Sequence, residues 1–440
     1  MPRVDTSFAI PLVLLGIALF VVSLGFGIFT PILPQYAEKL GIDVASLGFA
    51  YSLYNVALII CLFPSGIMAD RLGRVKTIVL GMVLFALSSL MLAFANDLFL
   101  FASARVIEGV GSAVVTPAIL ALTADLAPPE RRGGGMGFTS TMETIGGLAG
   151  PTVGGLIAQT AGFTSPFYVA CAMALISAGL VLPIRDRTTR SASSSSQSSP
   201  LAIFSSLREN VSASRSLLVL CFRGFIIGVS QGLFVLVFVL YMAFRVGMQP
   251  AEVGFSFTLI SGSMLAFSFL AGHLSDRFGR KPFVILGGII IGSMILAFSL
   301  TRTMTEVYVV SIILGLGVAL NNAPINALLA DCVIAEIRAK VMGGYEVIVG
   351  LGRTLGVLLL GGLYSISSSA PFNLLGGLMF VTVGLVAVFV TEPRSKAGIP
   401  ISPLPSEEKV AAIPENGVTV LSASLEDDKT RTLVERAIVG

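Results

Sequence analysis

The stretch GIMADRLGRVK, residues 66–76, places four charged side chains between two long apolar segments. The segment before it, YNVALIICLFPS, and the segment after it, TIVLGMVLFALSSLMLAFA, contain no charged residue. A similar stretch, GHLSDRFGRK, occupies residues 272–281. A charged motif that occurs twice between apolar segments indicates a membrane-spanning chain built from two similar halves.

The composition separates this chain from soluble proteins. Of its 440 residues, 55% are hydrophobic and only 12% are charged, and its mean hydropathy is +0.91. A soluble domain has about 25% charged residues, so this chain has too little polar surface to cover a particle in water. A protein with many membrane spans is the class that fits.

Several other classes are excluded by what the sequence lacks. Its four cysteines show no paired spacing and His273 is the only histidine, so neither a disulfide framework nor a metal site is indicated. No Gly-x-x-x-x-Gly-Lys phosphate loop occurs, and no nucleophile–base arrangement is recognisable. We therefore expect no enzyme, no cofactor and no nucleic-acid partner.

Apolar segments long enough to cross a bilayer, about 20 residues each, occur twelve times. They lie near 8–30, 46–66, 77–95, 99–124, 136–160, 165–184, 215–243, 253–272, 283–302, 306–330, 341–365 and 371–391. Each is predicted to be helical, because lipid offers no partner for unpaired backbone groups. The fold class is thus all-α integral membrane, with twelve transmembrane helices in two six-helix halves.

The basic residues predict the orientation of these spans. With the N-terminus inside, 22 of the 28 Lys and Arg residues fall on the inner side, as the positive-inside rule requires of cytoplasmic loops. The predicted parts are an N-terminal half at 1–184, a Ser-rich cytoplasmic linker at 185–214, a C-terminal half at 215–391 and a tail at 392–440. The linker and tail are too polar to bury a core and are expected to be flexible or disordered.

A shift of 206 residues aligns the two halves. It superimposes Gly48 on Gly254 and Asp125 on Asp331, together with the charged motif itself. In the motif, Gly66, Asp70, Arg71, Gly73 and Arg74 fall on Gly272, Asp276, Arg277, Gly279 and Arg280. Parallel six-span halves are one known plan of transporters, in which the substrate site lies between the halves near mid-membrane.

The chain resembles the major facilitator superfamily, over about residues 8–391. The resemblance rests on the motif G-x-x-x-D-R-x-G-R after span two, on its repeat after span eight, and on RVIEGVG at 105–111. A fourth stretch, GGLAGPTVGG at 146–155, is similar to the span-five signature of the drug–proton antiporter branch. Its motif residues are Gly147, Gly150, Pro151, Gly154 and Gly155. In that family the signature implies tight packing of spans five and eight; ordinary small-residue packing is the alternative.

The charged motif is interpreted as a cytoplasmic latch. Gly66 would permit close helix packing, Gly73 an unusual turn, Asp70 an interaction with a helix N-terminus, and Arg74 an ion pair with Asp125. By the repeat, Asp276, Arg277, Gly279, Arg280 and Asp331 would form a second such cluster, and Arg71 completes the first. The alternative is a basic loop that only fixes the topology.

Charged side chains inside the spans are costly and are therefore candidate functional residues. Arg105 and Glu108 are three residues apart and share a helix face, whereas Glu143 has no base within one turn on its own helix. We assign proton coupling to Glu143, with Arg105 and Glu108 as its support. Structural pairing of Arg105 with Glu108, or contact of Glu143 with an inner loop, is the alternative.

The remaining polar residues in the spans outline a candidate substrate cavity. They are Asn55, Thr139, Arg223, Gln231, Asn321, Asn322 and Arg353. Amides in a membrane also join helices to one another, so each of these positions has a structural alternative.

The leading hypothesis is a monomeric secondary transporter that exports a small organic molecule in exchange for protons by alternating access. Its partners would be the substrate, protons and the lipid bilayer, and it would lie in the plasma membrane with both termini cytoplasmic. A metabolite importer or uniporter of the same fold is one alternative. A membrane scaffold or sensor that does not transport is another.

Overall fold

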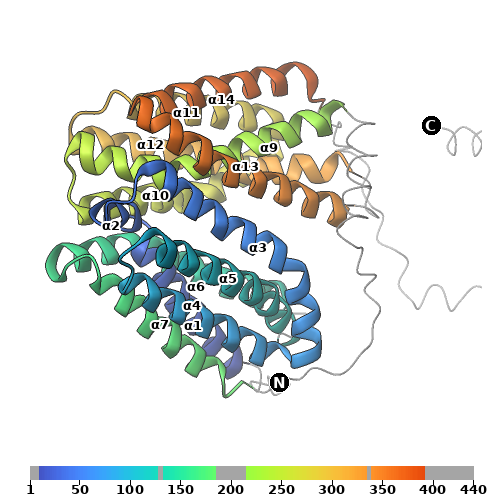
Figure 1. Cartoon of the computed structure of the whole chain (residues 1–440). Helices are drawn as coiled ribbons and strands as arrows, with labels where there is room; N and C mark the ends of the chain where they lie inside the picture. The colour runs from blue at the N-terminus through green and yellow to red at the C-terminus, as the bar shows by residue number, and fades with distance from the viewer. Residues whose placement is uncertain (1–8, 127–131, 185–214, 334–337, 392–440) are drawn as a thin grey trace, which may run out of the picture. The chain divides into compact units, whose positions relative to one another are not determined.

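The computed structural model consists of helices joined by short connections in the part of the chain that it describes (Figure 1). That part comprises residues 9–126, 132–184, 215–333 and 338–391. These ranges contain no β-strand and belong to one compact unit. The predicted linker at 185–214 and tail at 392–440 lie outside the described residues.

Six long helices make up the first half, which we call the N-half. They are α1 (Ala9–Phe29), α3 (Val44–Leu72), α4 (Arg74–Ala93), α5 (Leu98–Leu126), α6 (Arg132–Ala161) and α7 (Ser165–Val181). A short helix that the hydropathy pattern did not predict, α2 (Leu33–Lys39), follows α1. Pro34 at its start favours a helical first turn, and its apolar residues are buried.

The second half, the C-half, repeats this order. Its helices are α9 (Arg215–Leu233), α10 (Pro250–Phe278), α11 (Arg280–Phe298), α12 (Met304–Asp331), α13 (Arg338–Ile366) and α14 (Ala370–Phe389). The predicted seventh span is not a regular α-helix to its end. It continues from α9 as π-helical turns at η2 (Phe234–Phe238) and η3 (Tyr241–Val246).

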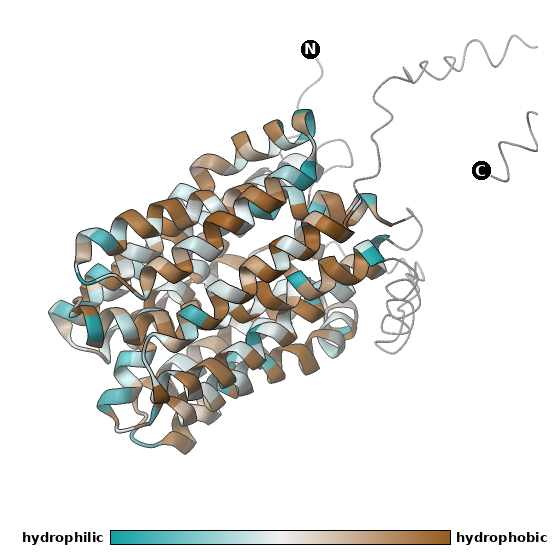
Figure 2. Ribbon diagram, turned by 90° about the horizontal axis from the view of Figure 1, so that it is seen from above, coloured by the Kyte–Doolittle hydropathy of each residue, from teal (hydrophilic) through white to brown (hydrophobic). Residues whose placement is uncertain are grey.

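Each of the twelve predicted spans therefore corresponds to one long helical segment. Ten of the described helices are long and apolar enough to cross a membrane. The two others are α7, which has 17 residues, and α6, whose sequence is rich in glycine and threonine. Figure 2 shows the hydrophilic residues mainly toward the ends of the helices, and mostly hydrophobic residues between.

The charged motif forms a sharp junction between helices rather than a loop. Gly73, with φ 93° and ψ 149°, is the only residue between α3 and α4, and Gly279, with φ 94° and ψ 151°, joins α10 to α11 in the same way. A side chain would strain this backbone conformation, which glycine adopts freely. We call the end of the bundle that carries Gly73 and Gly279 the motif end, and the opposite end the far end.

The two halves meet through two pairs of helices, α3 with α13 and α6 with α10. A Cβ atom on Gly48 of α3 would lie 2.9 Å from the carbonyl oxygen of Val357, and one on Gly254 of α10 would lie 2.1 Å from that of Pro151. Both glycines and both carbonyls are 206 residues apart. The repeat seen in the sequence therefore produces two equivalent contacts in the interface, one on each side.

Hydrogen bonds follow the same relation. The Ser52 hydroxyl donates to the carbonyl oxygen of Thr354 at 3.1 Å, and the Thr258 hydroxyl donates to that of Leu148 at 2.8 Å. These pairs are again separated by 206 residues. The second contact has one addition, because the hydroxyls of Thr152 and Thr258 lie 2.7 Å apart.

The hydrophobic core shows where the halves join and where they part. One cluster contains residues of both halves, among them Leu47 and Val357. Toward the motif end each half has a core of its own, represented by Val75 and Leu122 in the N-half and by Leu328 in the C-half. The halves are therefore packed together at the far end and separate at the motif end.

We expect Gly254→Ala to destabilise the protein, because the added methyl group would meet a backbone oxygen that cannot move cheaply. Overpacking of this kind costs about 1–3 kcal/mol, more than the gain of about 1 kcal/mol from replacing glycine in a helix. Gly262→Ala on the same helix is the control, since its nearest contact would be 3.8 Å away. The melting temperature of the purified protein should fall for Gly254→Ala only. Equal melting temperatures would show that the two helices are not in contact there.

Candidate functional site

A cavity of about 860 Å³ lies between the two halves. Most of its lining comes from α1, α3, α5 and α6 of the N-half. The C-half contributes five residues: Val235, Phe257, Ser261, Arg353 and Val357. A cavity of this size is suited to a small organic molecule.

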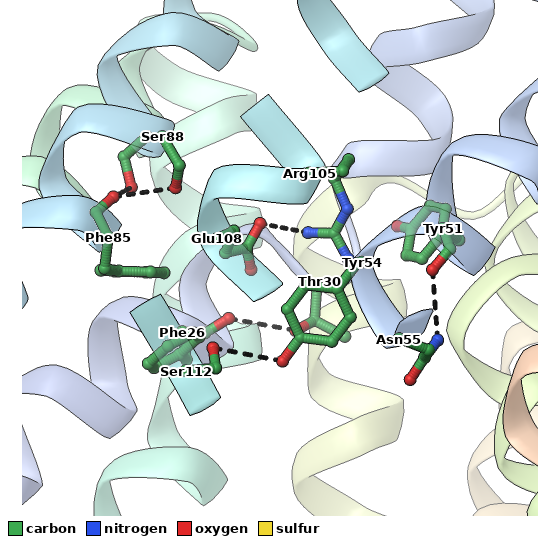
Figure 3. A network of polar contacts seen from close by, with 11 residues as sticks. Phe26, Thr30, Tyr51, Tyr54, Asn55, Phe85, Ser88, Arg105, Glu108 and Ser112 are labelled. Carbon is green, nitrogen blue, oxygen red and sulfur yellow. Dashed lines mark hydrogen bonds and ion pairs between the residues drawn. The ribbon is translucent and has the colours of Figure 1, made fainter. Parts of the chain in front are cut away.

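The N-half wall contains a buried ion pair between Arg105 and Glu108, one turn apart on α5 (Figure 3). The exposed fractions of the two side chains are only 5% and 3%. The guanidinium carbon of Arg105 lies 4.6 Å from the ring centre of Tyr51 and 4.5 Å from that of Tyr54. Two cation–π contacts and one carboxylate therefore hold this arginine in place and neutralise it.

Tyr51 and Tyr54 are functional candidates that the sequence analysis missed. They lie three residues apart on α3 and so share the face that packs on α5. The Tyr54 hydroxyl donates to the Ser112 hydroxyl at 3.3 Å. Two tyrosines at helical spacing opposite a membrane-embedded arginine would have been the signal.

Glu143 and Arg353 differ from this pair because neither has an ion-pair partner among the described residues. Glu143 lies on α6 with an exposed side chain that lines the cavity. Arg353 lies on α13, and its Nε donates a hydrogen bond to Gln231 at 2.9 Å. The two charges come from opposite halves and line the same cavity.

The predicted cavity residues divide into two groups. Asn55 lines the cavity and donates to the Tyr51 carbonyl oxygen at 3.1 Å, and Gln231 is joined to the cavity through Arg353. Thr139 does not line it, because its hydroxyl faces the Gly135 carbonyl oxygen of its own helix. Asn322 is exposed elsewhere on α12.

Arg223 and Asn321 correct the prediction most clearly. Arg223 is fully buried inside the C-half, away from the cavity. Its guanidinium donates to Thr382 at 3.0 Å, to the Val284 carbonyl oxygen at 3.2 Å and to the Asn321 side chain at 2.6 Å. These bonds join α9 to α11, α12 and α14. Neutral acceptors inside the helix bundle bind both terminal nitrogens of this arginine, whereas its buried Nε has no hydrogen-bond partner among the described residues.

The span-five motif contacts two different helices. Gly150 and Gly154 face α1, where added Cβ atoms would lie 2.6 Å from Gly27 and 1.7 Å from the Ile28 carbonyl oxygen. Gly155 faces α10 at the far end. The packing of spans five and eight is thus present, with a second close contact to span one that the sequence did not indicate.

Two members of the motif have other positions. Pro151 presents its carbonyl oxygen to Gly254 across the interface and also lines the cavity. Gly147 lines the cavity, and a Cβ there would meet no atom of another described segment within 4 Å.

At the motif end, each half contains an ion pair of the same design. Arg74 is paired with Asp125 and donates to the Ala121 carbonyl oxygen at 2.5 Å. In the C-half, Arg280 is paired with Asp331 and donates to the Ala327 carbonyl oxygen at 3.0 Å. These contacts join helices within one half and do not cross to the other.

The other motif residues are placed as follows. Asp276 lies 3.6 Å from Arg280, while Arg71 and Arg277 are exposed in the last turns of α3 and α10. The Asp70 side chain lies outside the described part of the structure. Contrary to the prediction, a Cβ on Gly66 would meet no atom of another described segment within 4 Å, because the halves are separate at this end.

Comparisons with known proteins agree with this architecture. A family profile described as Major Facilitator Superfamily matches residues 15–229 and again residues 220–409. The chain is 27% identical over 390 residues to Multidrug resistance protein 2 of Bacillus subtilis (strain 168), covering 87% of this chain and 95% of that protein. It is 23% identical over 373 residues to Quinolone resistance protein NorA of Staphylococcus aureus (strain MRSA252), covering 84% and 94%.

The fold also matches a solved structure. The crystal structure of a bacterial homologue of the human lysosomal transporter Spinster, in an inward-facing and unoccupied conformation, superimposes with a TM-score of 0.70. The match covers 88% of this chain and 96% of the other at 17% identity. Because the family profile matches both halves, this chain belongs to the Major Facilitator Superfamily and is a membrane transporter rather than an enzyme.

Proposed function

We propose that this transporter exports a small organic molecule across the plasma membrane in exchange for protons. The observation that carries the proposal is a cavity between two halves packed together at the far end, lined by Glu143, whose carboxylate has no ion-pair partner among the described residues. A transporter needs a site between its halves that opens to one side at a time. A proton-coupled one also needs an acid in that site that can bind and release a proton.

The names of the relatives support export of an organic compound, because they refer to multidrug resistance and quinolone resistance. The lining of the cavity fits such a substrate. It combines aromatic rings, among them Phe26, Phe29, Tyr54 and Phe257, with a few charged groups. This mixture binds apolar molecules and orients them through a small number of polar contacts.

The orientation that we propose places the motif end in the cytoplasm. Among the described residues, most of the basic ones lie toward this end, including Arg71, Arg74 and Lys76, as the positive-inside rule requires of a cytoplasmic side. In this orientation both termini would be cytoplasmic, and the separation of the halves at the motif end would correspond to a state open to the inside. A substrate would enter from the cytoplasm.

Glu143 is our candidate for proton coupling. Glu108 forms an ion pair with Arg105, so the arginine compensates its negative charge and Glu108 does not need to bind a proton. Glu143 faces the cavity and has no basic partner among the described residues, so a proton or a substrate cation has to compensate it. The Arg105–Glu108 pair supports the site by fixing α5 against Tyr51 and Tyr54 of α3.

The charged motif is proposed as a latch that closes the motif end in the opposite state. The separated halves leave Arg71 and Arg277 exposed there, while Arg74 and Arg280 rigidify each half. Partly exposed pairs contribute about 0–1 kcal/mol each. Such weak contacts suit an interface that forms and breaks in every cycle.

We expect Glu108→Gln to destabilise the protein, since it leaves Arg105 buried without its counter-charge. Removal of one partner of a buried pair costs about 3–5 kcal/mol. The double variant Arg105→Met/Glu108→Gln should regain much of the loss, because it leaves no buried charge. Thermal unfolding of the three proteins measures this coupling. Additive losses in the double variant would show that the two side chains act independently.

For the latch, Asp70→Asn should leave expression and melting temperature unchanged but lower the transport rate severalfold, because only a charge at the motif end is removed. Asp43→Asn is the matched control. Asp43 caps α3 at the far end by accepting from the Ser46 amide at 3.0 Å, and asparagine caps equally well. If Asp70→Asn transports at the wild-type rate, the motif is not a latch and only fixes the topology of the chain in the membrane.

Proton exchange is tested with inside-out vesicles and a panel of fluorescent aromatic compounds. Vesicles that are acidic inside should accumulate substrate, because protons leave the lumen as substrate enters. Glu143→Gln should abolish this pH-driven accumulation while exchange of labelled for unlabelled substrate persists, since that exchange needs no proton transfer.

Glu346→Gln is the control for this experiment, since Glu346 is exposed on α13 and does not line the cavity. It should behave as wild type. Accumulation that ignores an imposed pH gradient would favour a uniporter instead. If Glu108→Gln loses proton coupling while Glu143→Gln keeps it, then Glu108 and not Glu143 is the residue that carries the coupled proton.

A further inference from the structure

The charges of the cavity are arranged as one neutralised pair and two single charges. Arg105 and Glu108 compensate each other inside the N-half wall. Glu143 in the N-half and Arg353 in the C-half both line the cavity without an ion-pair partner among the described residues. The cavity thus offers a ligand one carboxylate and one guanidinium, from opposite walls.

The two-fold relation between the halves places these charges at similar depth. The helices that carry them, α6 and α13, are repeat partners. Arg353 corresponds to Gly147, one turn along α6 from Glu143, at a rise of about 1.5 Å per residue. The two single charges are therefore offset by about 6 Å along the bundle axis, in addition to lying on facing walls.

Both charges are available to a ligand. Gln231 accepts only the Nε hydrogen of Arg353, which orients the guanidinium and leaves its two terminal nitrogens without a hydrogen-bond partner among the described residues. On the facing wall, the position that corresponds to Arg353 is Gly147, where an added Cβ would meet no other described segment within 4 Å. The cavity therefore has open space beside Gly147, one turn from Glu143, and Arg353 lines the same cavity.

We propose that the substrate is amphoteric: an aromatic molecule with a cationic group at one end, bound by Glu143, and an anionic group at the other end, bound by Arg353. The aromatic core would pack against Phe26, Tyr54 and Phe257 between the charges. This inference rests on the proposed export function, whose substrate class it names. A ligand with only a cationic group would leave Arg353 uncompensated, and one with only an anionic group would leave Glu143 to be compensated by a proton.

Binding of four ligands that share one fluorescent core tests this class. The parent is 6-(piperazin-1-yl)-2-naphthoic acid, which carries both charges at opposite ends. Its methyl ester keeps the cation only, its N-acetyl derivative keeps the anion only, and the doubly modified compound is neutral. The chain contains no tryptophan, so naphthyl fluorescence can be measured on the purified full-length protein with little background.

The parent should bind wild type most tightly, and masking either charge should weaken binding about tenfold, as expected for loss of one charge-assisted contact. In Glu143→Gln, masking the amine should no longer matter, whereas masking the carboxylate still should. Arg353→Gln should show the reverse pattern, and Arg353→Lys should regain part of the preference for the carboxylate.

Glu346→Gln and Arg302→Gln, which change exposed charges outside the cavity, are the controls and should keep the wild-type pattern. Equal affinity of wild type for the neutral compound and the parent would overturn the proposal. So would equal weakening of all four ligands in both cavity variants. If a variant fails to fold, the affinities of the four ligands for wild type still test whether both charges of the ligand are bound.

The binding assay needs no pH gradient, so it separates this inference from the proposed function. Charge-selective binding without pH-driven transport of any member would refute proton-coupled export and leave the ligand class standing. Transport of all four members at equal rates would refute the ligand class and leave export standing.

Discussion

The close approach of backbones at Gly48 and Gly254 is the constraint on which the rest of the structure depends. At these two positions a helix of one half packs directly on a carbonyl group of the other, opposite Val357 and Pro151. Without a hydrophobic driving force between helices in lipid, such contacts and the hydrogen bonds beside them hold the halves together. Because both lie toward the far end, the halves are joined there and leave a cavity toward the motif end.

Because the same sequence pattern occurs in both halves, it produces both contacts. The relation is not complete, however. The α6–α10 contact is closer than the α3–α13 contact and has an extra hydrogen bond between Thr152 and Thr258. The span-five glycines strengthen the same side, because they also bring α6 against α1. One interface is thus more tightly packed than the other.

The charged residues of the cavity depart most from the repeat. The positions that correspond to Arg105 and Glu108 are Ser311 and Leu314, and those that correspond to Glu143 and Arg353 are Val349 and Gly147. Scaffold positions such as the motif glycines and ion pairs are duplicated, whereas the ionisable groups of the cavity occur once. The two halves therefore share their scaffold, and each contributes different ionisable groups to the cavity.

Hydropathy, charge distribution and the repeat determined the class of fold, the twelve spans and the division into halves, because the bilayer imposes length and polarity on every span. The pairing of Arg105 with Glu108 followed from their spacing along one helix, and that of Arg74 with Asp125 from the position of Asp125 at the inner end of span four. Only the tertiary structure decided which polar residues face the cavity. Arg223 and Arg353 look alike in the sequence, each an arginine within an apolar helix. The faces of α9 and α13 that carry them contact different neighbours, so one arginine is buried against Asn321 and Thr382 while the other lines the cavity. The rotation of a helix about its axis depends on contacts between distant segments, and a single apolar span does not specify it.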